Sequence, residues 1–108
     1  MLREALLQAS NSPVFVPADP DEALLRHIES KHRAAIADLA EELARRRRVW
    51  IAAREHGEFA RILQAELRYA ETAATLAARL RQRGESEATV EAYLAAKRRE
   101  NDRWLLAA

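Results

Sequence analysis

The feature that most constrains this chain is the near absence of residues that interrupt a helix. No proline occurs after Pro20, and Gly57 and Gly84 are the only glycines. The rest of the chain is built largely from alanine, leucine, arginine and glutamate, which favour the α-helix, while β-branched residues are scarce. This composition predicts an all-α fold in which each glycine marks the end of a long helix.

The chain divides into three segments. Residues 1–19 predict an N-terminal arm. Each proline in this segment biases the residue before it away from the helical region of the backbone. Residues 20–84 predict a long antiparallel helical hairpin of coiled-coil type, with helices over about 20–56 and 58–83. Residues 85–108 predict a C-terminal helix. A single helix that continues through Gly57 is the alternative to the hairpin.

Local chemistry supports the predicted helix ends. Asp19 is a favourable N-cap and Pro20 suits the first helical position. Gly57 favours a left-handed C-terminal cap, and Ser86 favours the N-cap of the last helix. The sequence therefore predicts three helices, the first of them unusually long.

The first long helix carries an apolar seam with a mean spacing of about 3.5 residues, the coiled-coil period, and one irregularity near His32. Pairing this seam with a second stripe across the Gly57 turn places Trp50 against Leu63. We expect the following residues to form the core or the oligomerisation surface: Leu25, Ile28, Ile36, Leu39, Leu43, Trp50, Phe59, Leu63, Leu67 and Leu80. Apolar residues outside the mutual seam predict a homo-oligomer: Ile51, Ile62, Tyr69 and Leu76.

Catalytic and metal sites are not expected. The chain contains no cysteine, which excludes disulfides and thiolate ligands. Glu29 and His32 have the Glu-x-x-His spacing of carboxylate-bridged di-iron bundles, but the facing positions 82–85 lie at a helix end beside Gly84. His32 is therefore interpreted as a half-buried seam residue, and we expect a non-enzymatic protein with no metal and no cofactor.

No apolar run approaches the roughly 20 residues that span a bilayer. The apolar stretch at the start of the sequence is too short and contains too many charges to be a signal peptide. We therefore expect a cytoplasmic protein with no membrane partner.

The run of four arginines at residues 45–48 is the most distinctive local feature. Four consecutive helical residues cover about 300° of the helix circumference, so at least one of them must approach a packed surface. One interpretation is a surface that contacts DNA phosphates through Arg45, Arg47, Arg48 and Arg54, with Arg46 paired to Glu66. The other is a solvated collar of ion pairs with Glu41, Glu42 and Glu66.

The apolar C-terminal residues Trp104, Leu105 and Leu106 stand where helix ends usually fray. They either pack on the hairpin of their own chain or dock on a protein partner.

The stretch from Val49 to Arg83 resembles the oligomerisation hairpin of phage small terminase subunits. An alanine-rich helix ends at Gly57-Glu58, and a second helix rich in leucine and alanine returns from it, with Leu63, Leu67, Ala70 and Leu76 in its stripe. The resemblance implies a DNA-packaging adaptor that assembles into a ring and docks on a large terminase ATPase. Such proteins usually carry an N-terminal helix-turn-helix, for which residues 1–20 leave no room.

The missing module implies a reduced form, as in a phage-derived gene transfer agent, which binds double-stranded DNA weakly and without sequence preference. The alternative function is a helical interaction or scaffold module that binds no nucleic acid.

Overall fold

The computed structural model of the protein describes residues 19–107, and the side chains of residues 19–103. The described part is all-α, as predicted, and contains no strand. Its helices are α1 (Pro20–Lys31), α2 (Arg33–His56), α3 (Phe59–Gln82) and α4 (Glu87–Ala107). The predicted arm, except for its last residue Asp19, and the side chains of Trp104, Leu105 and Leu106 lie outside the described residues.

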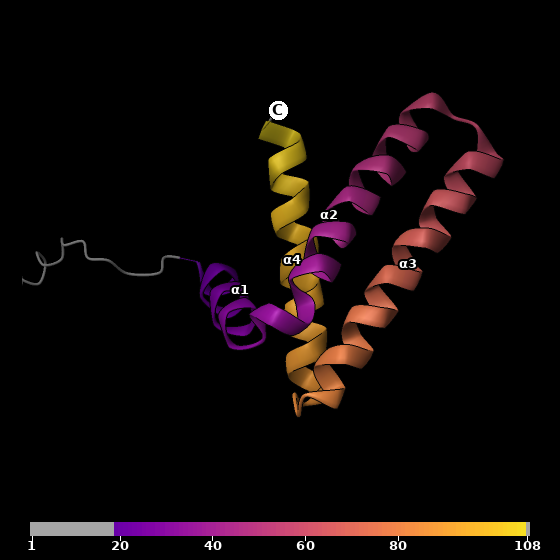
Figure 1. Ribbon diagram of the computed structural model, residues 1–108. Coiled ribbons are helices and arrows are strands. Elements are labelled where there is room, and N and C mark those ends of the chain that lie inside the picture. Colours follow the sequence, from indigo (N-terminus) through magenta and orange to yellow (C-terminus); the bar gives the residue numbers. More distant parts are fainter. Residues whose placement is uncertain (1–18, 108) are drawn as a thin grey trace, which may run out of the picture.

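The first long helix is interrupted, and the prediction of one helix over about 20–56 is wrong. His32 separates α1 from α2 with φ −118° and ψ 26°. Figure 1 shows α1 turning away from the axis of α2. The break lets Leu25 and Ile28 of α1 join a core that α4 shares, instead of extending along α2 into solvent.

The chain reverses direction between α2 and α3 (Figure 1). Gly57 adopts the left-handed conformation with φ 78°, and its N–H donates to the carbonyl oxygen of Ala53 at 3.1 Å. A side chain at this φ would strain the backbone, which explains the glycine. No helix passes through Gly57, so the alternative of one continuous helix is wrong. The contact between α2 and α3 is the most extensive of the contacts between helices in the described residues.

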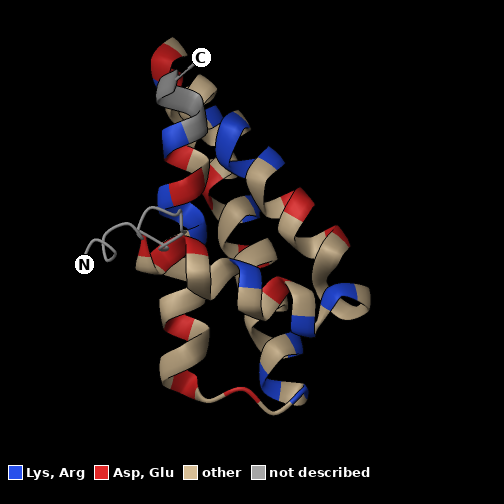
Figure 2. Cartoon of the chain, turned by 90° about the vertical axis from the view of Figure 1, so that its left-hand side faces the viewer, with Lys and Arg blue, Asp and Glu red and all other residues tan. Residues whose placement is uncertain are grey.

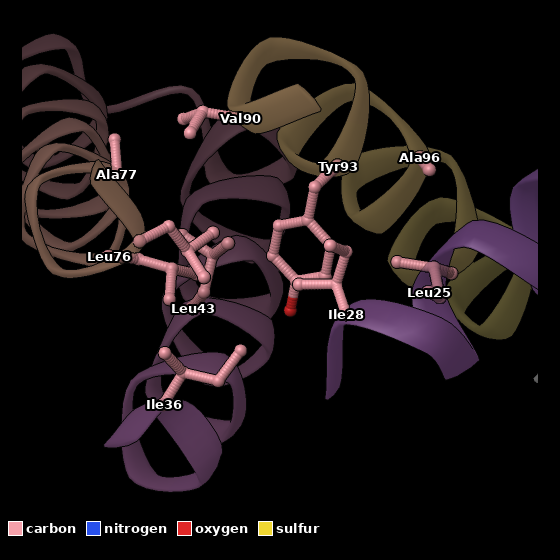
Figure 3. Packing of buried hydrophobic residues seen from close by; sticks show 10 residues of the cluster. Leu25, Ile28, Ile36, Leu43, Leu76, Ala77, Val90, Tyr93 and Ala96 are labelled. Atoms are coloured by element: carbon pink, nitrogen blue, oxygen red, sulfur yellow. The ribbon is translucent and has the colours of Figure 1, made fainter. Parts of the chain in front are cut away.

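All four helices contribute to one hydrophobic core (Figure 3). Ile36 and Leu43 of α2 are fully buried there, as are Leu76 and Leu80 of α3. From α4 come Val90, Ala96 and Tyr93, whose ring reaches towards Ile28 of α1 in Figure 3. The Tyr93 hydroxyl donates to a Glu29 carboxylate oxygen at 2.7 Å, which satisfies the polar end of a buried ring.

The rotation of α3 differs from the sequence expectation. Phe59, Leu63 and Leu67, predicted in the hairpin seam, are 77%, 44% and 56% exposed. Tyr69, predicted outside the seam, faces α2 instead: its ring lies 5.4 Å from that of Trp50. As core residues of a single chain, the three exposed positions are therefore wrong.

The remaining predicted core residues divide into two groups. Leu25, Ile28, Ile36, Leu43 and Leu80 are buried, whereas Leu39 and Trp50 are half-buried. Leu76, expected outside the seam, is completely buried, while Ile51 and Ile62 are half-buried. Phe59, Leu63 and Leu67 have thus exchanged roles with Tyr69 and Leu76, whereas Leu80 is buried as predicted.

Candidate functional site

An exposed apolar stripe runs along α3, and we call it the α3 ridge: Phe59, Leu63, Leu67, Ala70 and Ala74. Successive members are three or four residues apart, so they lie on one face of the helix. All five are exposed within the single chain. Together they form a continuous apolar surface on an otherwise highly charged protein, and such surfaces mark interaction sites.

A second surface feature is an open groove of about 740 Å³ between α2 and the walls formed by α1 and α4, which we call the α2 groove. Its α2 side runs from Arg33 to Arg48, with Ala37, Ala40 and Ala44 between them. The groove has no lining residue from α3, so it is separate from the α3 ridge. Its small side chains would allow another helix to approach closely.

Two of the four consecutive arginines form local ion pairs on α2. The Arg46 Nε donates to a Glu42 carboxylate oxygen at 2.6 Å, and Arg45 pairs with the other oxygen of the same carboxylate. The hydrogen bond from Arg45, and then that from Arg46, holds the pKa of Glu42 below its ordinary value. Arg46 therefore pairs with Glu42, and its predicted pairing with Glu66 is wrong.

Arg47 is the buried member of the run, at 9% exposure. Its Nε and Nη2 donate to the two carboxylate oxygens of Asp102 on α4, at 2.7 Å and 3.0 Å. The guanidinium carbon lies 4.6 Å from the ring centroid of Trp50 and 5.5 Å from that of Tyr69. These contacts join α2, α3 and α4, and they occupy the guanidinium of a residue that the sequence analysis predicted to contact DNA.

Arg48 and Arg54 are exposed, and neither has an ion-pair partner among residues 19–103. They are the two predicted DNA contacts whose charge remains available. Figure 2 shows basic and acidic segments alternating along the helices rather than gathering on one face. The arginine run thus contains two arginines paired with Glu42, one buried arginine and one exposed arginine without an ion-pair partner among residues 19–103.

His32, at the α1–α2 break, connects to the far end of α3. Its Nε2 lies 2.6 Å from a Glu85 carboxylate oxygen, and its Nδ1 accepts a hydrogen bond from the Arg83 Nε at 3.0 Å. These contacts assign the ring proton to Nε2. The Lys31 Nζ lies 3.1 Å from the same Glu85 oxygen. The histidine is 3% exposed. It is therefore a buried residue that links the α1–α2 break to the C-terminal end of α3.

Glu29 and His32 do not converge on a common point. The Glu29 carboxylate accepts hydrogen bonds from the Tyr93 hydroxyl at 2.7 Å and lies 2.8 Å from the Lys97 Nζ. In the part of the chain that the structure describes, no group of three histidine or acidic side chains is placed to hold a metal ion. Glu29 and His32 therefore take part in two separate sets of polar contacts, Glu29 with α4 and His32 with the residues after α3.

Comparison with family models, curated proteins and solved structures finds no match to this chain. Among the helices over residues 20–107, none is both long and apolar enough to cross a bilayer.

Proposed function

We propose that this chain is a non-enzymatic assembly module whose protomers associate through the α3 ridge. The observation that carries the proposal is the exposure of Phe59, Leu63 and Leu67 at 77%, 44% and 56%. Burying apolar surface releases about 25 cal/mol per Å² of area, so a partner that covers these side chains gains substantial free energy. The buried core of an interface is more apolar than the rest of the protein surface, is depleted in charged residues and has a polar rim.

A charge within the ridge tests this proposal without disturbing the core. Leu63→Glu places a carboxylate in the centre of the apolar surface, and we expect the oligomer to dissociate at micromolar concentration. Gln64→Glu adds the same charge at the neighbouring exposed position and should leave the particle mass unchanged. Sedimentation equilibrium measures the mass, and circular dichroism checks that helicity is retained. If the two variants had the same particle mass, the α3 ridge would not be part of the surface through which the chains associate.

A second candidate function is a DNA-packaging adaptor of the small-terminase kind, which docks on a large terminase ATPase. The observation that favours it is the pair of exposed cations on α2, Arg48 and Arg54, on a chain whose residues 45–108 carry 14 basic and 9 acidic side chains. With so few free arginines per chain, attraction to phosphates is weak, and an oligomer would strengthen it by avidity.

Gel-shift titration over a series of salt concentrations separates the two candidates. A DNA-binding adaptor should show log affinity falling linearly with log salt, by about 0.9 for each phosphate contact, and equal competition by unrelated duplexes. Arg54→Glu should weaken every duplex alike. Attraction to phosphates is strong at about 50 mM salt. If the unmodified chain binds no duplex there, the DNA-packaging candidate is rejected and the assembly module that binds no nucleic acid remains.

A further inference from the structure

We propose that a small pocket between α2 and α3 binds a phosphate group. The two helices lie side by side (Figure 1), and a pocket of about 290 Å³, which we call the arginine pocket, opens between them. It is lined by Arg46 and Val49 of α2 and by Arg61, Gln64, Ala65 and Arg68 of α3. None of these residues belongs to the α3 ridge or lines the α2 groove, so the inference goes beyond the proposed self-association.

The charges that line the arginine pocket are all positive. Three of its six lining residues are arginines, and no acidic residue in the described part of the chain lines it. A hollow lined by one sign of charge concentrates counter-ions, and an anion held there relieves the repulsion among the arginines. The α2 groove differs in this respect, because both basic and acidic side chains line it.

The arginines retain donor groups for such an anion. The Arg46 Nε donates to Glu42 at 2.6 Å, and the Arg61 Nε lies 3.2 Å from a Glu58 carboxylate oxygen. The terminal nitrogens of these two arginines form no hydrogen bond within residues 19–103. Arg68 has no ion-pair partner among the same residues. Two of the three positive charges are therefore partly balanced, and the third is not.

The lining also indicates which anion the pocket suits. A guanidinium donates two parallel N–H groups in a fork that matches the oxygens of a phosphate. Phosphate oxygens point in several directions, so more than one arginine can bind the same group, whereas the two oxygens of a carboxylate lie in one plane. The Gln64 amide supplies a further, neutral donor, and Val49 and Ala65 carry no side-chain acceptor that competes for the arginines. A phosphate group of free polyphosphate or of a nucleic acid backbone has this chemistry.

Isothermal titration calorimetry with inorganic tripolyphosphate tests the pocket at about 100 mM salt, where the Debye length is about 10 Å. Arg68→Gln removes the unpaired charge and should lower the affinity by about tenfold. Gln64→Glu places a carboxylate among the arginines and should also lower it. Arg33→Gln is the matched control: it removes one exposed charge about 20 Å along α2 from Arg46, at 1.5 Å rise per residue, and should leave the affinity unchanged.

Competition distinguishes the two sources of the phosphate group. A pocket that takes a nucleic acid backbone predicts that a short duplex displaces tripolyphosphate, and that Arg68→Gln weakens unrelated duplexes alike. A pocket that takes free polyphosphate alone predicts no displacement.

The inference would be overturned if the unmodified chain bound no tripolyphosphate. It would also be overturned if Arg68→Gln and Arg33→Gln bound it equally, because the attraction would then reflect the charge of the whole chain. Circular dichroism checks that each variant keeps its helicity. Neither result changes the particle mass, which separately tests the proposed self-association.

Discussion

At the scale of single residues, Arg47 shows how one buried cation fixes the arrangement of several helices. Burying a guanidinium is costly unless its charge is balanced and its N–H groups are bonded. The two oxygens of Asp102 provide both, in the bidentate geometry that arginine favours over lysine. Trp50 and Tyr69 cover the faces that remain, and these contacts orient α3.

Removing Arg47 should therefore destabilise the fold much more than removing its neighbour. Arg47→Ala leaves Asp102 unpaired, and we expect a loss of roughly 2–4 kcal/mol, near the lower part of the range for a broken buried pair because Asp102 is partly exposed. Arg48→Ala, one residue along, should change the free energy of unfolding of the isolated chain by less than about 0.5 kcal/mol. Urea denaturation of dilute protein measures both. Similar losses would show that the pairing with Asp102 contributes little.

The ionised Glu85 carboxylate should make the stability of the fold depend on pH. The hydrogen bond from His32, and next that from Lys31, holds the pKa of this carboxyl below its ordinary value of 4.5. Because the folded pKa is lower than the unfolded one, the contribution to stability is complete above about pH 4.5 and is lost as the pH falls further.

Thermal unfolding from about pH 6 to about pH 3 measures this dependence. The unmodified chain should unfold at a higher temperature than Glu85→Gln at the upper end, and the advantage should shrink as the solution becomes acidic. A constant difference across the range would mean that the Glu85 charge does not contribute.

At the scale of elements, helix ends depend on local chemistry, and helix rotation depends on distant contacts. The sequence indicated the cap of α1 at Asp19, the left-handed Gly57 and the Ser86 hydroxyl, which accepts from the Thr89 N–H at 3.1 Å. Each of these signals involves residues within four positions of one another. The all-α fold was predictable for the same reason, because helix propensity is a local property.

The rotation of α3 could not be predicted in this way. Both of its stripes are apolar, and the stripe with Leu63 and Leu67 is as suitable for a core as the stripe with Tyr69 and Leu76. Contacts to Trp50 and Arg47, together with the position of α4, decide between them. Likewise, the irregularity at His32 was visible in the apolar spacing, but its bonds to Arg83 and Glu85 depend on how α3 ends.

The packing of α2 gives a graded prediction for its two central leucines. Leu43 is completely buried, so Leu43→Ala should cost about 2–5 kcal/mol through lost contacts and a cavity. Leu39 is half-buried at the edge of the core, so Leu39→Ala should cost clearly less. Chemical denaturation of both variants gives the comparison. Equal costs, or a larger cost at Leu39, would contradict the observed rotation of α2.

At the scale of the whole molecule, the two candidate functions use different surfaces: the α3 ridge for assembly, and the exposed arginines of α2 for DNA. Arg48 and Arg54 lie on α2 and are not part of the α3 ridge. Arg48→Glu and Arg54→Glu should therefore weaken DNA binding without changing assembly, which gel-shift titration and light scattering measure separately. The elongated molecule, with extents of 60 × 34 × 21 Å, exposes the ridge along its length.

The central claim is that the chain does not remain a monomer, and the mass of the unmodified protein in solution tests it most directly. Light scattering after size separation, from about 1 μM to about 100 μM, compares the particle with the 12.3 kDa chain. We predict particles of several chains that dissociate on dilution, with a melting temperature that rises with concentration. A constant mass of 12.3 kDa and a melting temperature independent of concentration would contradict the claim.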